Sequence, residues 1–244
     1  APNSVNSYYV ENSFNKVTLT GRTYGWFTLS QDNNDCNYNY SRWSNEADQK
    51  ALESGIDVST YRHVVYVFAP PSTCGSVGFG TLGGMPSRSW IFNYIDDRRV
   101  FEHEFGHNMG IHHANSIQCG SLAIDVYSNC SQAEYGDYFD VMGNFWFVTP
   151  YELHFNATHK AALGWVPVTN ITTSGRYQVS PIESVQDTPQ VLRISKPDTG
   201  EVYMVSYRQP IGYDAGLTSG VTRGASIHVW NGNASYQTKI IDTT

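Results

Sequence analysis

Charged residues are scarce in this sequence, and basic residues are the scarcer kind. Asp, Glu, Lys and Arg make up 15% of the 244 residues, against about a quarter in an average soluble domain. With 15 basic and 22 acidic residues, the formal net charge is -7. Because binding to a phosphate backbone needs a basic surface, this balance argues against a nucleic acid as the partner.

Long apolar stretches are also missing. No run reaches the roughly 20 apolar residues that a membrane-spanning helix needs, so the sequence predicts no membrane span. It contains no internal repeat and no low-complexity segment. The chain starts at Ala1 without an initiator Met or a signal peptide, and we expect that a signal and a propeptide have been removed. Hydrophobic residues still make up 40% of the chain, which is enough for a packed core.

Cysteine is limited to four residues, and none has the spacing of a cysteine zinc site. Three disulfide connectivities are possible for four cysteines. We favour Cys36–Cys74 with Cys119–Cys130, because the second bond would close the loop after residue 113; free buried thiols are the alternative. Paired cysteines together with N-x-S/T sequons predict a secreted glycoprotein. The sequons begin at Asn39, Asn129, Asn156, Asn170 and Asn233.

The most informative stretch is 100–115, VFEHEFGHNMGIHHAN, which contains the pattern H-E-x-x-H-x-x-G-x-x-H. Residues four apart share one face of a helix, so His103 and His107 can bind one metal ion. Gly110 can take the positive φ that ends a helix, and the turn would bring His113 back as the third ligand. Three neutral histidines with one open position are typical of catalytic zinc. Glu104 follows the first ligand and is the candidate catalytic base.

Other residues near this pattern need an interpretation. His112 adjoins the third candidate ligand, but the spacing favours His113, and we expect His112 to be a supporting or surface residue. The segment 135–144, YGDYFDVMGN, contains Met142 followed by a glycine. We interpret it as the methionine turn that metzincin peptidases place beneath their three histidines; a core methionine is the alternative. His63, His154 and His159 lie outside any motif and are expected to be structural.

Three segments, HEFGHNMGIHHA, YFDVMG and HKAALGW, resemble the gametolysin family of metzincin metallopeptidases. The resemblance covers residues 64–165 well and the remainder loosely. It implies a secreted zinc endopeptidase with one catalytic Zn²⁺; structural calcium does not follow from the sequence. The residues that it implies at the site are the catalytic Glu104, the ligands His103, His107 and His113, and the structural Gly110 and Met142.

The resemblance also bears on the substrate cleft. Residues 79–85, FGTLGGM, resemble the edge strand that pairs with an extended substrate in metzincins, although an ordinary glycine-rich connector is an equal alternative. Phe145, Trp146 and Phe147 would help to line the pocket for a substrate side chain, with core packing as the alternative for each of them. Astacins and serralysins carry a metal-binding tyrosine two residues after the methionine. Asn144 takes that position here, so a tyrosine ligand is not expected.

The order of expected elements indicates an α+β fold with two domains, residues 1–166 and 167–244. The first is a metzincin-type catalytic domain with a twisted, mostly parallel sheet, an active-site helix and the methionine turn. The second is a small all-β, sandwich-like domain, either truncated at residue 244 or completed by another part of the molecule. One or two strands are expected within 7–29, separated by a turn at 21–25. Further strands are expected at 63–69, 79–85, 89–94, 168–180, 190–195, 201–208 and 225–230. Helices are expected from Ser44 to Gly55, from near Asp97 with Asp96 as its N-cap, and over 152–163, with a long loop at 115–136.

These observations predict a secreted endopeptidase that hydrolyses extracellular or cell-wall proteins and glycoproteins. A zinc-bound water attacks the peptide carbonyl, while Glu104 takes the proton of the water and passes it to the leaving amine. Tyr135, Tyr138 and Tyr151 are candidates for stabilising the oxyanion. One alternative is a glycopeptidase or mucin-type zinc hydrolase whose β domain binds sugar. Another is a non-catalytic binding module on a metzincin frame, which the presence of Glu104 disfavours. The oligomeric state does not follow from the sequence.

Overall fold

The structure is a computed structural model that describes residues 4–30, 34–69, 73–143, 153–186, 188–233 and 237–241. The chain forms two compact units, which we call the helix–sheet unit, Leu19–Gly110, and the large-sheet unit, Ala1–Thr18 together with Ile111–Thr244. They do not follow the expected division at residue 166. The reason is that the segment after Gly110 and the first residues of the chain associate with the C-terminal strands.

The helix–sheet unit is built on a three-stranded sheet with the order β1-β3-β2. Strand β1 (His63–Val67) pairs in parallel with β3 (Ser87–Ile91), and β2 (Gly78–Gly80) pairs with β3 in antiparallel. The strands expected at 63–69 and 89–94 are therefore present. The segment expected at 79–85 supplies an edge strand, but only over Gly78–Gly80. With one parallel and one antiparallel pair, the sheet is mixed rather than mostly parallel.

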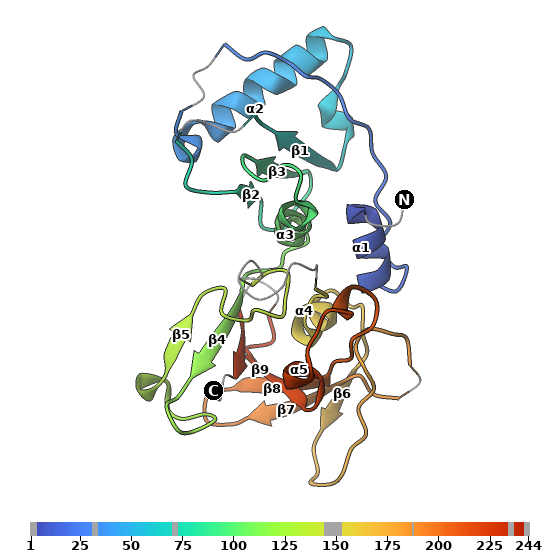
Figure 1. Ribbon diagram of the computed structural model, residues 1–244, viewed down its shortest axis with the longest axis vertical. Helices are drawn as coiled ribbons and strands as arrows, with labels where there is room; N and C mark the ends of the chain where they lie inside the picture. The colour runs from blue at the N-terminus through green and yellow to red at the C-terminus, as the bar shows by residue number, and fades with distance from the viewer. Residues whose placement is uncertain are drawn as a thin grey trace. The chain divides into compact units, whose positions relative to one another are not determined.

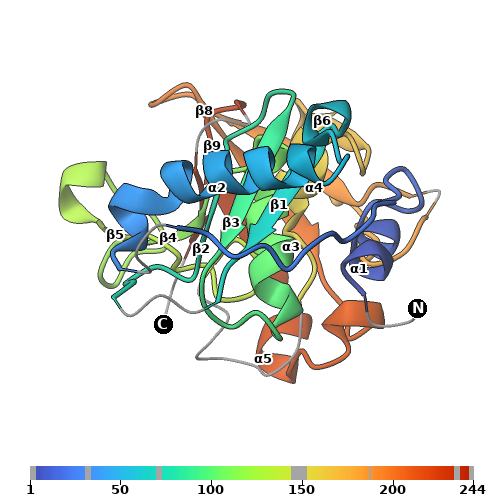
Figure 2. The same ribbon diagram turned by 90° about the horizontal axis from the view of Figure 1, so that it is seen from above.

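Two helices cover opposite faces of this sheet, α2 (Cys36–Glu53) and α3 (Arg98–Asn108) (Figures 1 and 2). On the α2 side, Trp43 packs with the aromatic residues Tyr66, Trp90 and Phe92. The disulfide Cys36–Cys74 ties the first residue of α2 to the segment before β2. The second disulfide, Cys119–Cys130, lies in the large-sheet unit, and both bonds match the favoured pairing. A short 3₁₀ turn, η1 (Val58–Thr60), precedes β1.

Both helix starts differ from the prediction. Helix α2 begins at Cys36, well before Ser44, and the Ser44 hydroxyl donates to the carbonyl of Ser41 inside the helix instead of capping it (3.1 Å). Helix α3 is capped by Asp97, whose carboxylate accepts from the amide of Arg99, so Asp96 is not the N-cap.

The large-sheet unit contains a seven-stranded sheet with the order β5-β4-β10-β9-β8-β7-β6 (Figure 1). Its strands are β4 (Ala114–Gln118), β5 (Ser131–Ala133), β6 (Val168–Ile171), β7 (Val191–Lys196), β8 (Glu201–Tyr207), β9 (Ala225–Trp230) and β10 (Thr238–Ile241). Strand β10 pairs in parallel with β4, and this joins the C-terminal strands to the segment after the histidine motif. The predictions of a separate sandwich-like domain and of a plain loop over 115–136 are therefore wrong. Short helical turns η2 (Tyr127–Asn129), η4 (Gly212–Asp214) and α5 (Ser219–Thr222) complete the unit.

Helix α4 (Ala157–Ala162) packs its Ala157 into the core of the large sheet, with Val191, Val202 and Met204 of the strands. The expected helix over 152–163 is shorter at its start, because Asn156 caps it by accepting from the amide of His159 (2.9 Å). Asn156 is fully buried, so this sequon is not a surface site.

The N-terminal segment forms a helix, α1 (Val5–Asn12), where strands were expected between residues 7 and 29. Ser4 and Ser7 form a capping box that starts this helix. Tyr8 and Tyr9, whose aromatic character favoured a strand, are buried against Phe155. Tertiary packing thus overrides local strand propensity here. Among the described residues, no helix has the length and apolarity needed to cross a membrane.

Candidate metal centre

Helix α3 carries the first two candidate ligands and is held firmly at both ends. Asp97 caps its start, and Val100 and Phe105 are buried along it. At its end the buried Asn108 accepts from the Ser89 hydroxyl (2.9 Å) and donates to the carbonyls of Thr81 (3.1 Å) and Arg88 (3.0 Å). One amide side chain therefore fixes the end of α3 to the segments around β2 and β3.

The three candidate ligands lie together. Each of His103, His107 and His113 offers a ring nitrogen, and these atoms all lie within 4.8 Å of one another. The rings of His103 and His107, one helical turn apart, have centroids 4.8 Å apart. Gly110 has φ +90°, the conformation expected for the turn after α3, and its amide donates to the carbonyl of His107 (2.8 Å). The chain then reaches His113 directly before β4.

Two neighbouring side chains hold the His113 ring. Its Nδ1 lies 2.6 Å from Oε1 of Glu134, and its ring centroid lies 3.9 Å from that of Tyr135. A carboxylate on Nδ1 leaves Nε2 of His113 for a metal, the arrangement that typically orients a zinc-binding histidine. Burial lowers the pKa of His113, which favours the neutral ring that a metal requires. Glu134 was missed because we treated 115–136 as a loop, although an acidic residue just before YGDYFDVMGN was visible.

Glu104 lies in the same helix, is only 4% exposed, and has its pKa raised to about 8 by burial. Strand β2 approaches it very closely. A Cβ on Gly78 would lie 2.7 Å from Oε1 of Glu104, and a Cβ on Gly80 would lie 2.5 Å from its carbonyl oxygen and 2.9 Å from Cβ of His107. The two glycines are therefore required for β2 to lie against the helix, a role that the sequence analysis did not assign to them.

The methionine turn, residues 137–143, lies against the residue that follows His113. Met142 is fully buried, its amide donates to Asp140 (2.6 Å), and its carbonyl accepts from the amide of Ala114 (2.9 Å). A side chain on Gly143 would overlap the carbonyl oxygen of Asp137, so the turn closes only with glycine there. This glycine requirement explains the M-G step of the motif.

The other four histidines that were interpreted from the sequence lie outside the three-histidine group. His112 is half-buried and is not part of the three-histidine group. His154 and His159 are buried and contact Glu11 and Asp140, each at 2.8 Å, while His63 contacts the Ser87 hydroxyl.

The three tyrosines proposed for the oxyanion differ in placement. Tyr135 lies on His113, with a left-handed backbone (φ +60°), and Tyr138 is 42% exposed. Tyr151 lies outside the described residues, as do Asn144 and the aromatic residues 145–147.

The donor set fits zinc. Three imidazoles within reach of one ion, one of them oriented by a carboxylate, match a catalytic zinc site. The buried Glu104, on the same helix as two of them, is a candidate proton-accepting group. A thiolate or all-oxygen set would have indicated another metal. The described residues thus include three candidate ligands and a candidate acid–base residue for metal-dependent hydrolysis.

Comparison with known proteins agrees with this chemistry. The family described as Gametolysin peptidase M11 matches residues 1–244, the whole chain. The chain belongs to the gametolysin peptidase family. This gametolysin-family chain is also similar to Autolysin of Chlamydomonas reinhardtii, with 25% identity over 229 residues. The match covers 77% of this chain but 34% of that relative, so the chain spans about a third of its length. No solved structure gave a significant match. Family membership indicates a metallopeptidase and implies a metal ion.

Proposed function

We propose that this gametolysin-family chain is a secreted zinc endopeptidase of the metzincin type. In this proposal His103, His107 and His113 hold one Zn²⁺, Glu104 is the catalytic acid–base residue, and Gly110 and Met142 shape the site. The observation that carries it is the group of three imidazoles within 4.8 Å, with a buried carboxylate on the same helix as two of them.

Glu104 and Glu134 would have different roles in the reaction. A bound zinc ion would polarise the scissile carbonyl and acidify a water molecule. Glu104 accepts the proton of the attacking water and donates it to the leaving amine. Its burial, which raises its pKa to about 8 in the metal-free chain, makes it an effective proton carrier near neutral pH. Glu134 keeps the proton of His113 on Nδ1 and so presents Nε2.

Two features support a secreted enzyme with an extracellular substrate. Both cysteine pairs are disulfide-bonded, which is typical of proteins from an oxidising compartment. Membership of the gametolysin family supports extracellular or cell-wall proteins and glycoproteins as the substrate class. The negative net charge disfavours binding to a phosphate backbone, and no nucleic acid is proposed as a partner.

The test is digestion of casein and of a heavily glycosylated protein by the parent chain and by Glu104→Gln, with bound zinc quantified in both. Glu104→Gln should keep zinc and lose roughly 10²–10⁴-fold in activity, because it removes the proton carrier but not a ligand. Glu53→Gln, the same exchange at an exposed site, is the control and should cut normally. A parent chain that binds no zinc, or full activity in Glu104→Gln, would rule the proposal out. Cleavage of the glycosylated substrate alone would identify a glycopeptidase.

A further inference from the structure

We propose that three buried basic side chains, His159, Arg208 and His228, are positioning residues that fix the methionine turn and, through it, the metal ligand His113. They come from α4, from the residue after β8 and from β9, far along the chain from the histidine motif. The inference rests on the proposed function, because it takes His113 as a metal ligand.

The first contact is made by His228 on Asp137, at the start of the turn. Asp137 is 1% exposed and His228 is 2% exposed, and Oδ2 of Asp137 lies 2.9 Å from Nε2 of His228. The same oxygen accepts from the side-chain amide of Asn156 (3.0 Å). Burial alone would raise the pKa of Asp137, but the hydrogen bond and charge of His228 lower it below its usual value. Asp137 is thus held as a carboxylate with no access to water.

The second contact is made by His159 on Asp140, in the middle of the turn. Oδ2 of Asp140 lies 2.8 Å from Nδ1 of His159 and accepts from the amide of Asn156 (2.6 Å). Its other oxygen accepts from the amide of Met142 (2.6 Å). The carboxylate of Asp140, which is fully buried, therefore connects helix α4 to the methionine itself.

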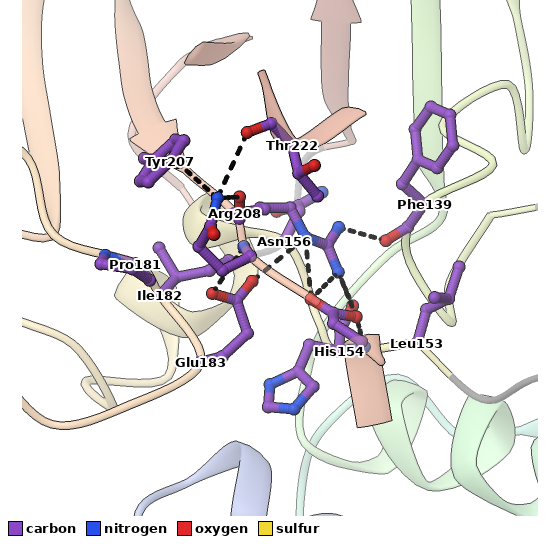
Figure 3. Close-up of polar contacts among 12 residues, drawn as sticks. Phe139, Leu153, His154, Asn156, Pro181, Ile182, Glu183, Tyr207, Arg208 and Thr222 are labelled. Atoms are coloured by element: carbon purple, nitrogen blue, oxygen red, sulfur yellow. Dashed lines mark hydrogen bonds and ion pairs between the residues drawn. The ribbon is translucent and has the colours of Figure 1, made fainter. Parts of the chain in front are cut away.

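Arg208 makes the third contact. Its Nη1 donates to the carbonyl of Phe139, which lies between the two aspartates in sequence (Figure 3). The rest of the guanidinium is held by Asp214, at 3.0 Å from Nε and 2.6 Å from Nη2. Figure 3 shows the guanidinium between Phe139 and the backbone of His154, to which Nη2 also donates (3.4 Å). Because the guanidinium is planar, buried and paired, it can hold a backbone carbonyl in a fixed position.

The turn is joined to His113 by backbone hydrogen bonds. Ala114, the next residue after His113, donates to the carbonyl of Met142 (2.9 Å) and accepts from the amide of Asp137 (3.1 Å). The turn is tightly packed, since a Cβ on Gly143 would overlap the carbonyl of Asp137. Removing one of these three side chains would leave a buried acceptor of the turn without its partner, so the turn would shift toward water. Both backbone groups of Ala114 would move with the turn, and the ring of His113 would move with them.

A matched residue separates positioning from general stabilisation. His154 is fully buried and forms comparable polar contacts, 2.8 Å to Glu11 and 2.8 Å to Nζ of Lys160, but its ring contacts no residue of the turn in the described part of the chain. His154→Leu should therefore lower the stability of the fold without changing how the metal is held. His228→Leu should do both, and His228→Gln, which keeps a donor for Asp137, should recover part of the effect.

The experiment uses the full chain below the melting temperature of each variant. Zinc affinity is measured by competition with a chelator, and the visible spectrum of the Co²⁺-loaded protein reports the ligand geometry. We expect zinc affinity to fall about 10–100-fold in His228→Leu and in Arg208→Met, with an altered Co²⁺ spectrum, as for other residues that orient ligands. His154→Leu should retain the parent values.

Each outcome bears on one proposal. If His228→Leu and Arg208→Met have the same metal affinity as His154→Leu at an equal folded fraction, the positioning role is wrong. The proposed function still stands in that case, provided that the parent chain binds zinc and cleaves its substrate. If the parent itself binds no zinc, the proposed function fails and the inference fails with it. Should the Leu and Met variants not fold, His159→Ala and His228→Ala, which remove the contacts with Asp140 and Asp137, carry the test. Parental affinity and spectrum in both would count against the role.

Discussion

Replacing Gly78 by alanine should disable the proposed catalytic base while leaving the fold and the metal ligands in place. The added Cβ would lie 2.7 Å from Oε1, 2.9 Å from Cγ and 3.0 Å from Cδ of Glu104. All three atoms belong to one side chain, and no backbone atom is equally close. The Glu104 side chain can therefore rotate away, and strand β2 need not separate from helix α3.

The size of the effect follows from how far the carboxylate must move. Ordinary contact distances require a shift of roughly half an ångström or more, and a misplacement near 1 Å can cost about 10²-fold in rate. We expect kcat/KM to fall about 10²-fold, equivalent to about 2.7 kcal/mol of transition-state stabilisation. The free energy of unfolding should change little. Alanine reduces the conformational entropy of the unfolded chain relative to glycine, and this stabilises the fold by up to about 1 kcal/mol.

Peptidase kinetics, zinc content and urea unfolding would be measured on Gly78→Ala beside two other glycine variants. Gly75→Ala is the neutral control, since among the described residues, its two chain neighbours aside, no atom lies within 4 Å of its added Cβ. Gly80→Ala meets the carbonyl of Glu104 at 2.5 Å and should also lose roughly 1–3 kcal/mol of stability, because backbone must move. Undiminished kcat/KM in Gly78→Ala, with zinc bound, would refute the reasoning.

Two further predictions concern the surroundings of the site. Glu134→Gln should weaken zinc binding about 10–100-fold by loosening His113, with little change in melting temperature because the Glu134 side chain is 55% exposed. Chelator competition beside Glu53→Gln would measure this, and unchanged affinity would contradict it. Burial lowers the pKa of Lys160 from 10.5 to about 7, so between these values the unfolded chain binds a proton that the fold does not. The stability of the parent relative to Lys160→Met should therefore rise from pH 7 to about pH 10, and a difference that is flat across this range in urea unfolding would contradict the shift.

Local signals in the sequence predicted part of the fold well. The strands around His63 and Trp90 follow from short runs that are rich in β-formers, and the histidine helix follows from its spacing. The N-terminal helix was missed because Tyr8 and Tyr9 favour a strand locally, whereas burial against Phe155 decides their conformation. The seven-stranded sheet was missed because β4 and β10 are too far apart in sequence for any local pattern to pair them.

The candidate site, like the fold, was predicted only in part from the sequence. By itself, the sequence determined the family, the three candidate ligands, the candidate acid–base residue and the glycine that ends the helix, because helical spacing and a positive φ are properties of neighbouring residues. Only the tertiary structure decided that Gly78 and Gly80 admit β2 to Glu104, that Glu134 orients His113, and that His228 contacts Asp137 across 91 residues. Such contacts depend on strand register and on the pairing of buried charges, which form only when distant segments pack together.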